Sequence, residues 1–454
     1  MKLLEYFNAF LRDTVNLNQS RLDDLDGRVD SITKALKIAP DLGVLVLDTV
    51  PQGSWAHETI IRPAEGFEFD ADFLVQVAED AAWDADPKRY AAAVWDALHE
   101  DSTYGTMATR KDRCVRVTYA NDCHIDVVPY VVLESGREVI VNRTTNQFED
   151  TNPVGFTEWL QGKDATTSGN LRRALRLLKY LRDQCNAFNI KSVLLTTLVG
   201  EVVTPIRATL TPGCYSDTPS TLVTVVQDLD AWLQARPSKP SLVDPSCSST
   251  SFDHRWTDAQ YAAFREKIHD LAPKIQAAYD EASPTASLTA WQEVFGSAFK
   301  ASTITASAAQ EVVKAAWIDH TDRAPQEDFI DELFPVSISH EVRIDCEVSK
   351  STYSNRAARR SALRSRKGRV SKKRDLLFKV TSTTVTEPYE VYWKVRNHGD
   401  EAAFKNQLRG KIEADTGQRQ RRESTSYTGH HFVDCYIVKN GVCVATARQQ
   451  VVID

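Results

Sequence analysis

The segment HIDVVPYVVL, residues 124–133, constrains the fold most, because it places an acid inside an otherwise apolar run. A short apolar run rich in β-branched residues is typical of a buried β-strand. Asp126 lies within this run, where an unpaired charge is costly to bury. The sequence therefore predicts that Asp126 has a partner, and a metal ion shared with other acids would supply one.

Two further acids lie in the strand-like run FEFDADFLVQV, residues 67–77. Side chains two positions apart point to the same face of a strand, so we expect Asp70 and Asp72 to lie side by side; Glu68 shares their parity. Adjacent carboxylates repel unless they are solvated or bridged by a cation, and Mg²⁺ prefers hard oxygen ligands. A D-x-D pair alone is more often a solvated strand face, and Asp126 is what favours a metal site.

Gly53 and Ser54 follow the first expected strand, 43–50, and the loop after it. A glycine lets a phosphate approach the backbone closely and the serine adds a hydroxyl, although most Gly-Ser pairs are only turns. Three acids on neighbouring strands with a Gly-Ser pair upstream are suited to two-metal phosphoryl transfer.

The order GS, then D-x-D, then HIDVVP resembles the nucleotidyltransferases of the polymerase-beta type. More narrowly, it resembles the cyclic-oligonucleotide synthases related to cGAS, the bacterial CD-NTases with a SMODS nucleotidyltransferase domain. Further matches within roughly residues 1–320 are QGS at 52–54 with Thr59 and Pro63, TNPVGFTEWL at 151–160 and KYLRDQCNAFNIKS at 179–192.

This resemblance implies roles for individual residues. Asp70, Asp72 and Asp126 would hold two Mg²⁺ or Mn²⁺ ions, and Asp126 would take the proton from the attacking ribose hydroxyl. Gly53 and Ser54 would hold the donor triphosphate. ATP and other nucleoside triphosphates would be the substrates, and the nucleotide pocket would also contain Lys179 and Ser192.

A basic stripe of Arg172, Arg176 and Lys179 runs beside the leucine stripe of the helix expected at 170–185. Such a stripe is more often a solvated helix face than a binding site. Lys179 differs because its position matches the lysine that contacts the triphosphate in the family.

The wider pattern predicts an α+β fold. Strands broken by helices indicate a mixed sheet, braced by one helix or two in series over 5–37. Further helical patterns occupy 87–100, 219–235, 257–282 and 287–316, and 236–255 is a Pro/Ser-rich loop. We expect a polymerase-beta-like nucleotidyltransferase core with an N-terminal spine helix (1–165), a helical lid (166–322), a basic linker (323–375) and a β-rich sensor domain (376–454).

The end of the chain resembles the adenylyl/guanylyl-cyclase and SMODS C-terminal sensor domain, in VYWKVRNHGDEA (391–402), QLRGKI (407–412) and ESTSYTGHHFVDCYIVKNGVCVA (423–445). Asn440-Gly441 predicts a hairpin turn. A nucleotide ligand would let Trp393 and Tyr427 stack on a base while Arg409 and His431 contact a phosphate. Alternatively, Trp393 belongs to the core, because apolar and aromatic residues alternate around it.

Composition limits the partners. The net charge of −7 argues against a protein that coats nucleic acid, although residues 350–374 contain eleven Lys or Arg and no acid. That segment predicts either a nucleic-acid site or a solvated linker. No apolar run is long enough to span a membrane, the N-terminus lacks the apolar block of a signal peptide, and the eight cysteines include no C-x-x-C pair. We therefore expect a cytoplasmic protein with reduced thiols and no membrane partner.

Three functions are consistent with these observations. The first is a Mg-dependent synthase of a cyclic di- or trinucleotide second messenger in bacterial anti-phage (CBASS-type) signalling, whose product acts on a separate effector protein. The second is a template-independent transferase that adds nucleotides to RNA or protein. The third is an inactive module that senses nucleotide or nucleic acid. The long N-terminal helix and helical lid favour the first over the second, and three crowded acids count against the third.

Overall fold

The computed structural model describes residues 1–64, 67–120, 122–300, 328, 330–334, 340–350, 361–363, 368–397, 400–405 and 407–453. The chain divides into two compact units, Met1–Lys300 and Ala301–Asp454. The first unit combines helices with a mixed sheet and the second is β-rich, as the sequence predicts.

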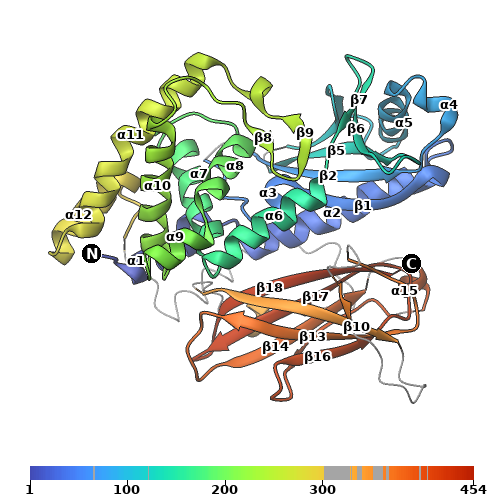
Figure 1. The fold of residues 1–454 in the computed structure, drawn as a ribbon. Helices are drawn as coiled ribbons and strands as arrows, with labels where there is room; N and C mark the ends of the chain where they lie inside the picture. The colour runs from blue at the N-terminus through green and yellow to red at the C-terminus, as the bar shows by residue number, and fades with distance from the viewer. Residues whose placement is uncertain are drawn as a thin grey trace. The chain divides into compact units, whose positions relative to one another are not determined.

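A seven-stranded mixed sheet forms one part of the first unit (Figure 1). Its main path runs β1 (Val46–Gln52), β2 (Phe69–Val77), β5 (Cys123–Val132), β4 (Val115–Tyr119) and β3 (Ala108–Arg110). β5 also pairs with β6 (Glu138–Asn142), which pairs with β7 (Gln147–Asp150). β2 and β5 are parallel, whereas the other pairs are antiparallel. The first strand starts later than expected because Gly43–Leu45 form a 3₁₀ turn.

Two helices cover one face of this sheet, α2 (Gln19–Ile38) and α5 (Lys88–His99). They pack against odd-numbered side chains of β2 and β5, such as Phe73 and Ile125. Even-numbered side chains point to the other face, where Leu74, Val128 and Tyr130 form a separate small cluster. The same alternation places Asp70, Asp72 and Asp126 on the face opposite α2 and α5.

The N-terminal region forms two helices in series, which was one of the two expected forms. α1 (Leu4–Phe10) continues into a π-helical turn, Leu11–Val15, and its Phe7 and Phe10 belong to the core of the helical part. α2 starts after Asn18, whose side chain caps it by accepting from the Arg21 amide. Of these two N-terminal helices, only α2 packs against the sheet, because its Leu25 and Ile32 belong to the sheet core.

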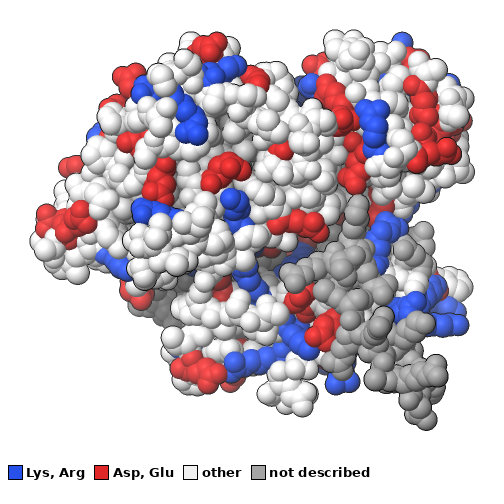
Figure 2. Space-filling model, viewed as in Figure 1, with Lys and Arg blue, Asp and Glu red and all other residues white. Residues whose placement is uncertain are grey.

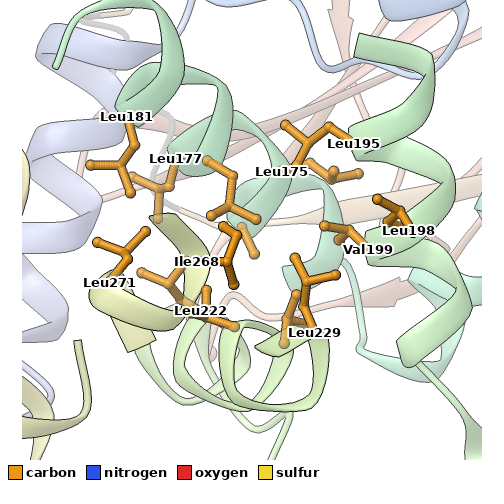
Figure 3. Close-up of a cluster of buried hydrophobic side chains, with 14 of the residues drawn as sticks. Leu175, Leu177, Leu181, Leu195, Leu198, Val199, Leu222, Leu229, Ile268 and Leu271 are labelled. Carbon is orange, nitrogen blue, oxygen red and sulfur yellow. The ribbon is translucent and has the colours of Figure 1, made fainter. Parts of the chain in front are cut away.

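The helical part of the first unit has its own core (Figure 3). It contains α6 (Pro153–Thr166), α7 (Asn170–Asp183), α8 (Ser192–Val202), α9 (Pro205–Leu210), α10 (Thr218–Gln234), α11 (Asp258–Asp280) and α12 (Pro284–Phe295). Leu175 and Leu177 of α7 share this core with Leu198 of α8, Leu222 of α10 and Ile268 of α11.

Two expectations for this part differ from the structure. The helix expected at 287–316 ends at Phe295, and residues 301–316 lie outside the described residues. The loop at 236–255 contains a short hairpin, β8 (Val243–Asp244) with β9 (Cys247–Ser251), and a 3₁₀ turn, η3 (Asp253–Arg255).

The second unit has two sheets that share one core. The first runs β11 (Ser361–Ala362), β10 (Val342–Lys350), β13 (Arg374–Thr383) and β16 (Gln420–Ser424). The second runs β12 (Arg369–Val370), β18 (Val442–Ile453), β17 (Gly429–Lys439), β14 (Glu390–Asn397) and β15 (Arg409–Ala414). The expected hairpin turn is present, since Asn440 and Gly441 have φ of 53° and 74° between β17 and β18. β10 falls in the segment expected to be linker, yet it is a paired strand because Val342, Cys346 and Val348 join the core.

The surface and the thiols agree with the composition. Lys and Arg are mixed with Asp and Glu on the face shown in Figure 2, and all eight cysteines are free. Among the helices of the described ranges, none is long and apolar enough to cross a bilayer. Most of the basic segment, including 351–360 and 364–367, lies outside the described residues.

Candidate active site

Strand register brings the three acids together. β2 and β5 pair in parallel, with Asp70 opposite His124 and Asp72 opposite Asp126. Directly opposite residues on paired strands have side chains in reach of each other. Asp72 is also opposite Gln52, the last residue of β1, so the chain leaves β1 beside this carboxylate at Gly53.

Two independent features favour glycine at position 53. Its φ of +61° lies in the left-handed region, which side-chain-bearing residues rarely adopt. A Cβ atom at this position would lie 2.7 Å from Oδ2 of Asp72, closer than real Cβ contacts. Gly53 opens the one-turn helix α3 (Gly53–Ala56), and Ser54 accepts a hydrogen bond at its carbonyl from the Thr59 amide at 2.8 Å.

The partner of Asp126 in this structure is Arg116, which lies opposite it on β4. The guanidinium donates from Nε and Nη2 to the two carboxylate oxygens of Asp126 at 2.7 and 2.9 Å. Its Nη2 also lies 3.5 Å from Oδ1 of Asp70. The expectation that Asp126 has a partner is correct, but sequence reasoning named a metal and missed this arginine. The signal was available, because Arg116 is the charged residue on the polar face of the alternating run VRVTY, as Asp126 is in HIDVVP.

The acids differ in environment. The side chain of Asp70 is 64% exposed and that of Asp126 is 15% exposed. Burial, followed by the charges of Asp126 and Asp70, raises the pKa of Asp72 to about 7. Although the Asp70 side chain is largely exposed, partial desolvation, together with the charge of Asp126, raises its pKa against the opposing effect of Arg116. The site therefore holds excess negative charge around Asp72.

These residues fit a divalent cation by their chemistry. Carboxylates are the hard oxygen donors that Mg²⁺ and Mn²⁺ prefer, and the repulsion at Asp72 is what a cation would relieve. Among the described residues, no three His, Cys, Asp or Glu side chains are arranged to hold a metal ion as they stand. Both oxygens of Asp126 accept from Arg116 in this structure.

The basic stripe of α7 binds the segment that follows α3. Arg172 pairs with the Glu58 carboxylate and Arg176 donates to the Glu58 carbonyl at 2.9 Å. Lys179, 4% exposed, donates from Nζ to the carbonyl and the hydroxyl of Thr59 at 3.0 and 2.9 Å. The stripe is thus not a solvated helix face; it fixes the loop that leads out of the Gly-Ser turn.

Lys179 also interacts electrostatically with Asp72. Burial, followed by the charge of Arg182, lowers the pKa of Lys179 to about 7, while Asp72 acts in the opposite direction. Ser192 is placed differently from the other expected residues: it begins α8, is exposed, and its hydroxyl accepts from Arg182 at 2.9 Å. The structure therefore brings together Gly53, the three acids and Lys179, whereas no described contact joins Ser192 to the acids.

Two other titratable residues around the acids and Lys179 were not predicted from the sequence. Arg255, in the loop expected at 236–255, lies within electrostatic range of Asp72 and of Arg113. His57 stacks on Phe156 at 5.2 Å between ring centroids, and burial lowers its pKa to about 3. Neither position shows a periodic signal, since both lie in short irregular segments. Glu68, which shares the parity of the acids, pairs instead with Nε2 of His124 at 2.7 Å.

Comparisons with known proteins agree with this geometry. Residues 1–164 match the family described as the Second Messenger Oligonucleotide or Dinucleotide Synthetase domain, SMODS. Residues 324–454 match the Adenylyl/Guanylyl and SMODS C-terminal sensor domain. Both resemblances expected from the sequence are confirmed.

Similar proteins extend these matches. A c-di-GMP synthase from Roseivirga ehrenbergii is 29% identical over 160 residues, which span 34% of this chain and 42% of that protein. A probable cyclic AMP-AMP-GMP nucleotide synthase from Salmonella paratyphi B is 22% identical over 364 residues, 66% of this chain and 92% of its own. The structure of the Bradyrhizobium diazoefficiens CD-NTase CdnG in complex with GTP superposes with a TM-score of 0.53 at 18% identity, covering 65% of this chain and 96% of that chain. The expected polymerase-beta-like fold is confirmed.

Proposed function

Because the chain joins a SMODS synthetase domain to a SMODS C-terminal sensor domain, we propose that it is a nucleotidyltransferase that makes a cyclic di- or trinucleotide. Nucleoside triphosphates, ATP among them, are the substrates and pyrophosphate leaves at each step. The observation that carries the proposal is the register that sets Asp72 opposite Asp126, with Gly53 packed on the Asp72 carboxylate. The names of the two similar synthases support the same chemistry.

Asp70, Asp72 and Asp126 hold the divalent cations, two Mg²⁺ or Mn²⁺ ions, in this proposal. Bound ions of this kind lower the pKa of a coordinated hydroxyl and neutralise charge on transferring phosphates. Arg116 keeps the Asp126 carboxylate oriented and neutralised before the ions bind.

The remaining roles follow from position. Asp126 accepts the proton of the attacking ribose hydroxyl. Gly53, which has no side chain, lets a triphosphate approach the backbone, and Ser54 offers its hydroxyl there. Lys179 holds this loop in place through Thr59 and interacts electrostatically with Asp72. It therefore supplies positive charge beside the triphosphate. Ser192 contributes to the nucleotide pocket only if its bond with Arg182 exchanges.

The biological setting is part of the proposal. The chain acts in the cytoplasm, in CBASS-type anti-phage signalling, and its product switches on a separate effector protein. The SMODS and sensor-domain pairing supports a signalling role.

The test is incubation of the purified full chain with four ribonucleoside triphosphates and Mg²⁺ or Mn²⁺, read by mass spectrometry. The wild type should make a phosphatase-resistant cyclic oligonucleotide, and the double variant Asp70→Ala/Asp72→Ala should make none. Glu68→Gln is the matched control, since Glu68 has the same strand parity but pairs with His124, and it should retain synthesis. Equal synthesis by wild type and the double variant would contradict the site, and label transferred to added RNA would favour a tailing enzyme.

A further inference from the structure

A cavity of about 240 Å³ opens between the two sheets of the second unit. Both sheets supply its apolar floor, which consists of Leu376, Phe378, Val395, Val433, Val451 and Ile453. Its rim is polar and includes Gln407, Arg409, Glu423, Ser424, Ser426 and Tyr427. Sites for drug-sized ligands occupy roughly 300–1,000 Å³, so this cavity suits a smaller, flat molecule with an apolar body and a polar edge.

The charges at the rim cancel. Arg409 donates from Nη1 and Nη2 to the two carboxylate oxygens of Glu423 at 2.5 and 3.2 Å. Arg421 also donates from Nε to Glu423 at 2.7 Å and pairs with Glu413. Glu423 therefore stays oriented by Arg421 when Arg409 turns toward a ligand. A paired guanidinium and carboxylate offer donors and acceptors side by side, which favours a neutral ligand over a phosphate.

One wall of the cavity is rigid and deeply buried. His431, 4% exposed, approaches the side-chain oxygen of Asn397 with Nδ1 at 3.1 Å and the carbonyl of Tyr427 with Nε2 at 2.8 Å. Asn397, 9% exposed, donates to the Gln407 carbonyl at 2.7 Å. This network fixes the backbone of Tyr427, one of the residues that line the cavity, and so holds an aromatic residue at the rim before any ligand enters.

The backbone of the rim is strained at Arg409. Its φ of +59° is left-handed although the residue is not glycine. The pairing of β14 with β15 is irregular between Lys394 and Arg396, directly opposite this position. Irregularities of this kind re-aim side chains, and strained residues of this kind concentrate at binding sites.

We propose that this cavity binds a guanine base. The ring edge of guanine presents one acceptor, O6, beside two N–H donors, which matches one guanidinium beside one carboxylate. Arg409 donates to O6 while Glu423 accepts from the two N–H groups. The purine ring lies over the apolar floor and against Tyr427, and the sugar remains outside. This site belongs to the second unit and does not depend on the proposed synthase activity.

The cavity revises two expectations for the sensor domain. His431 is held by Asn397 and Tyr427, and Arg409 lies against the Glu423 carboxylate, whose negative charge disfavours a phosphate at this position. Trp393 is 1% exposed and donates from Nε1 to Asp415 at 3.0 Å, so its alternative placement in the core is the correct one. Tyr427 is the aromatic residue at the rim of the cavity, and Phe378 lies in its floor.

The experiment uses the full chain with ¹³C-labelled isoleucine methyl groups, because Ile453 lies in the cavity floor and reports occupancy there independently of the nucleotidyltransferase site. The Ile453 signal is assigned by its loss in Ile453→Val. Guanosine is expected to shift this signal saturably. Inosine, which lacks the 2-amino group, and adenosine should bind at least about tenfold more weakly, as expected for loss of a paired donor.

Two substitutions and a control locate the interaction. Glu423→Gln and Tyr427→Ala should each weaken guanosine binding about tenfold or more. Glu413→Gln, which removes another partner of Arg421 but no cavity residue, should change it less than about twofold. No shift of Ile453 at millimolar guanosine, equal binding of adenosine, or equal affinities of Glu423→Gln and Glu413→Gln would overturn the proposal.

Discussion

Replacing Gly53 by alanine tests the geometry of the acidic site most directly. The added Cβ would lie 2.7 Å from Oδ2 of Asp72, whereas ordinary contact begins at 3.4 Å, so the two atoms must separate by about 0.7 Å (3.4 − 2.7). The φ of +61° adds a backbone cost of roughly 1–2 kcal/mol for a residue with a side chain. Asp72 must therefore move, or the turn at Gly53 must change.

Both consequences are measurable. Folding stability should fall by about 1–2 kcal/mol in urea denaturation. A misplacement approaching 1 Å of a catalytic group costs on the order of a hundredfold in rate, so cyclic-nucleotide synthesis should fall by up to about that factor. Mn²⁺ affinity should fall as well, because Asp72 is one of the proposed ligands.

Gly27→Ala is the matched control. Gly27 lies within α2, and a Cβ there would meet nothing within 4 Å. This variant should gain about 0.5–1 kcal/mol from helix propensity and keep full activity. The reasoning is wrong if Gly53→Ala equals wild type in stability and synthesis, or if both glycine variants lose activity alike.

Three other predictions follow from the first unit. Arg116→Met removes the guanidinium that pairs with Asp126, so it should tighten Mn²⁺ binding by about fivefold, which is about 1 kcal/mol after screening. Electron paramagnetic resonance measures this affinity, and unchanged or weaker binding would refute the prediction. Burial lowers the pKa of His57 to about 3, so between about pH 6.5 and 3 the unfolded chain binds a proton at this residue and the folded chain does not. The free energy of unfolding should therefore fall as pH drops below about 6.5, by up to about 2 kcal/mol at pH 5. In urea titrations between pH 7.5 and 5, His57→Gln should lose less folding stability than the wild type, and equal losses would refute the assignment. Gly200→Ala places a Cβ against the Trp159 ring, closer than real contacts, and should lower folding stability by about 1–3 kcal/mol despite the better helix propensity of alanine. A thermal melt unchanged from wild type, or no recovery of stability when Trp159 is also changed to Phe, would contradict this.

The sequence predicted the placement of Asp70 and Asp72 well, because local spacing decides it. Asp70 and Asp72 share a strand face, as a period of two requires. The hairpin at Asn440-Gly441 follows from residues that tolerate positive φ. Predictions were weaker for the loop at 236–255 and for the end of the helix at Phe295, where no apolar period marks the structure.

The sequence by itself determined which side chains share a face, where the two strands that carry the acids lie, and which residue types suit phosphoryl transfer. Only the tertiary structure decided that Asp126 faces both Asp72 and Arg116, that Lys179 binds Thr59 at a separation of 120 residues, and that residues of six strands line one cavity in the second unit. The physical reason is that alternation within a strand encodes its two faces, whereas strand order and register depend on packing between segments far apart in the chain.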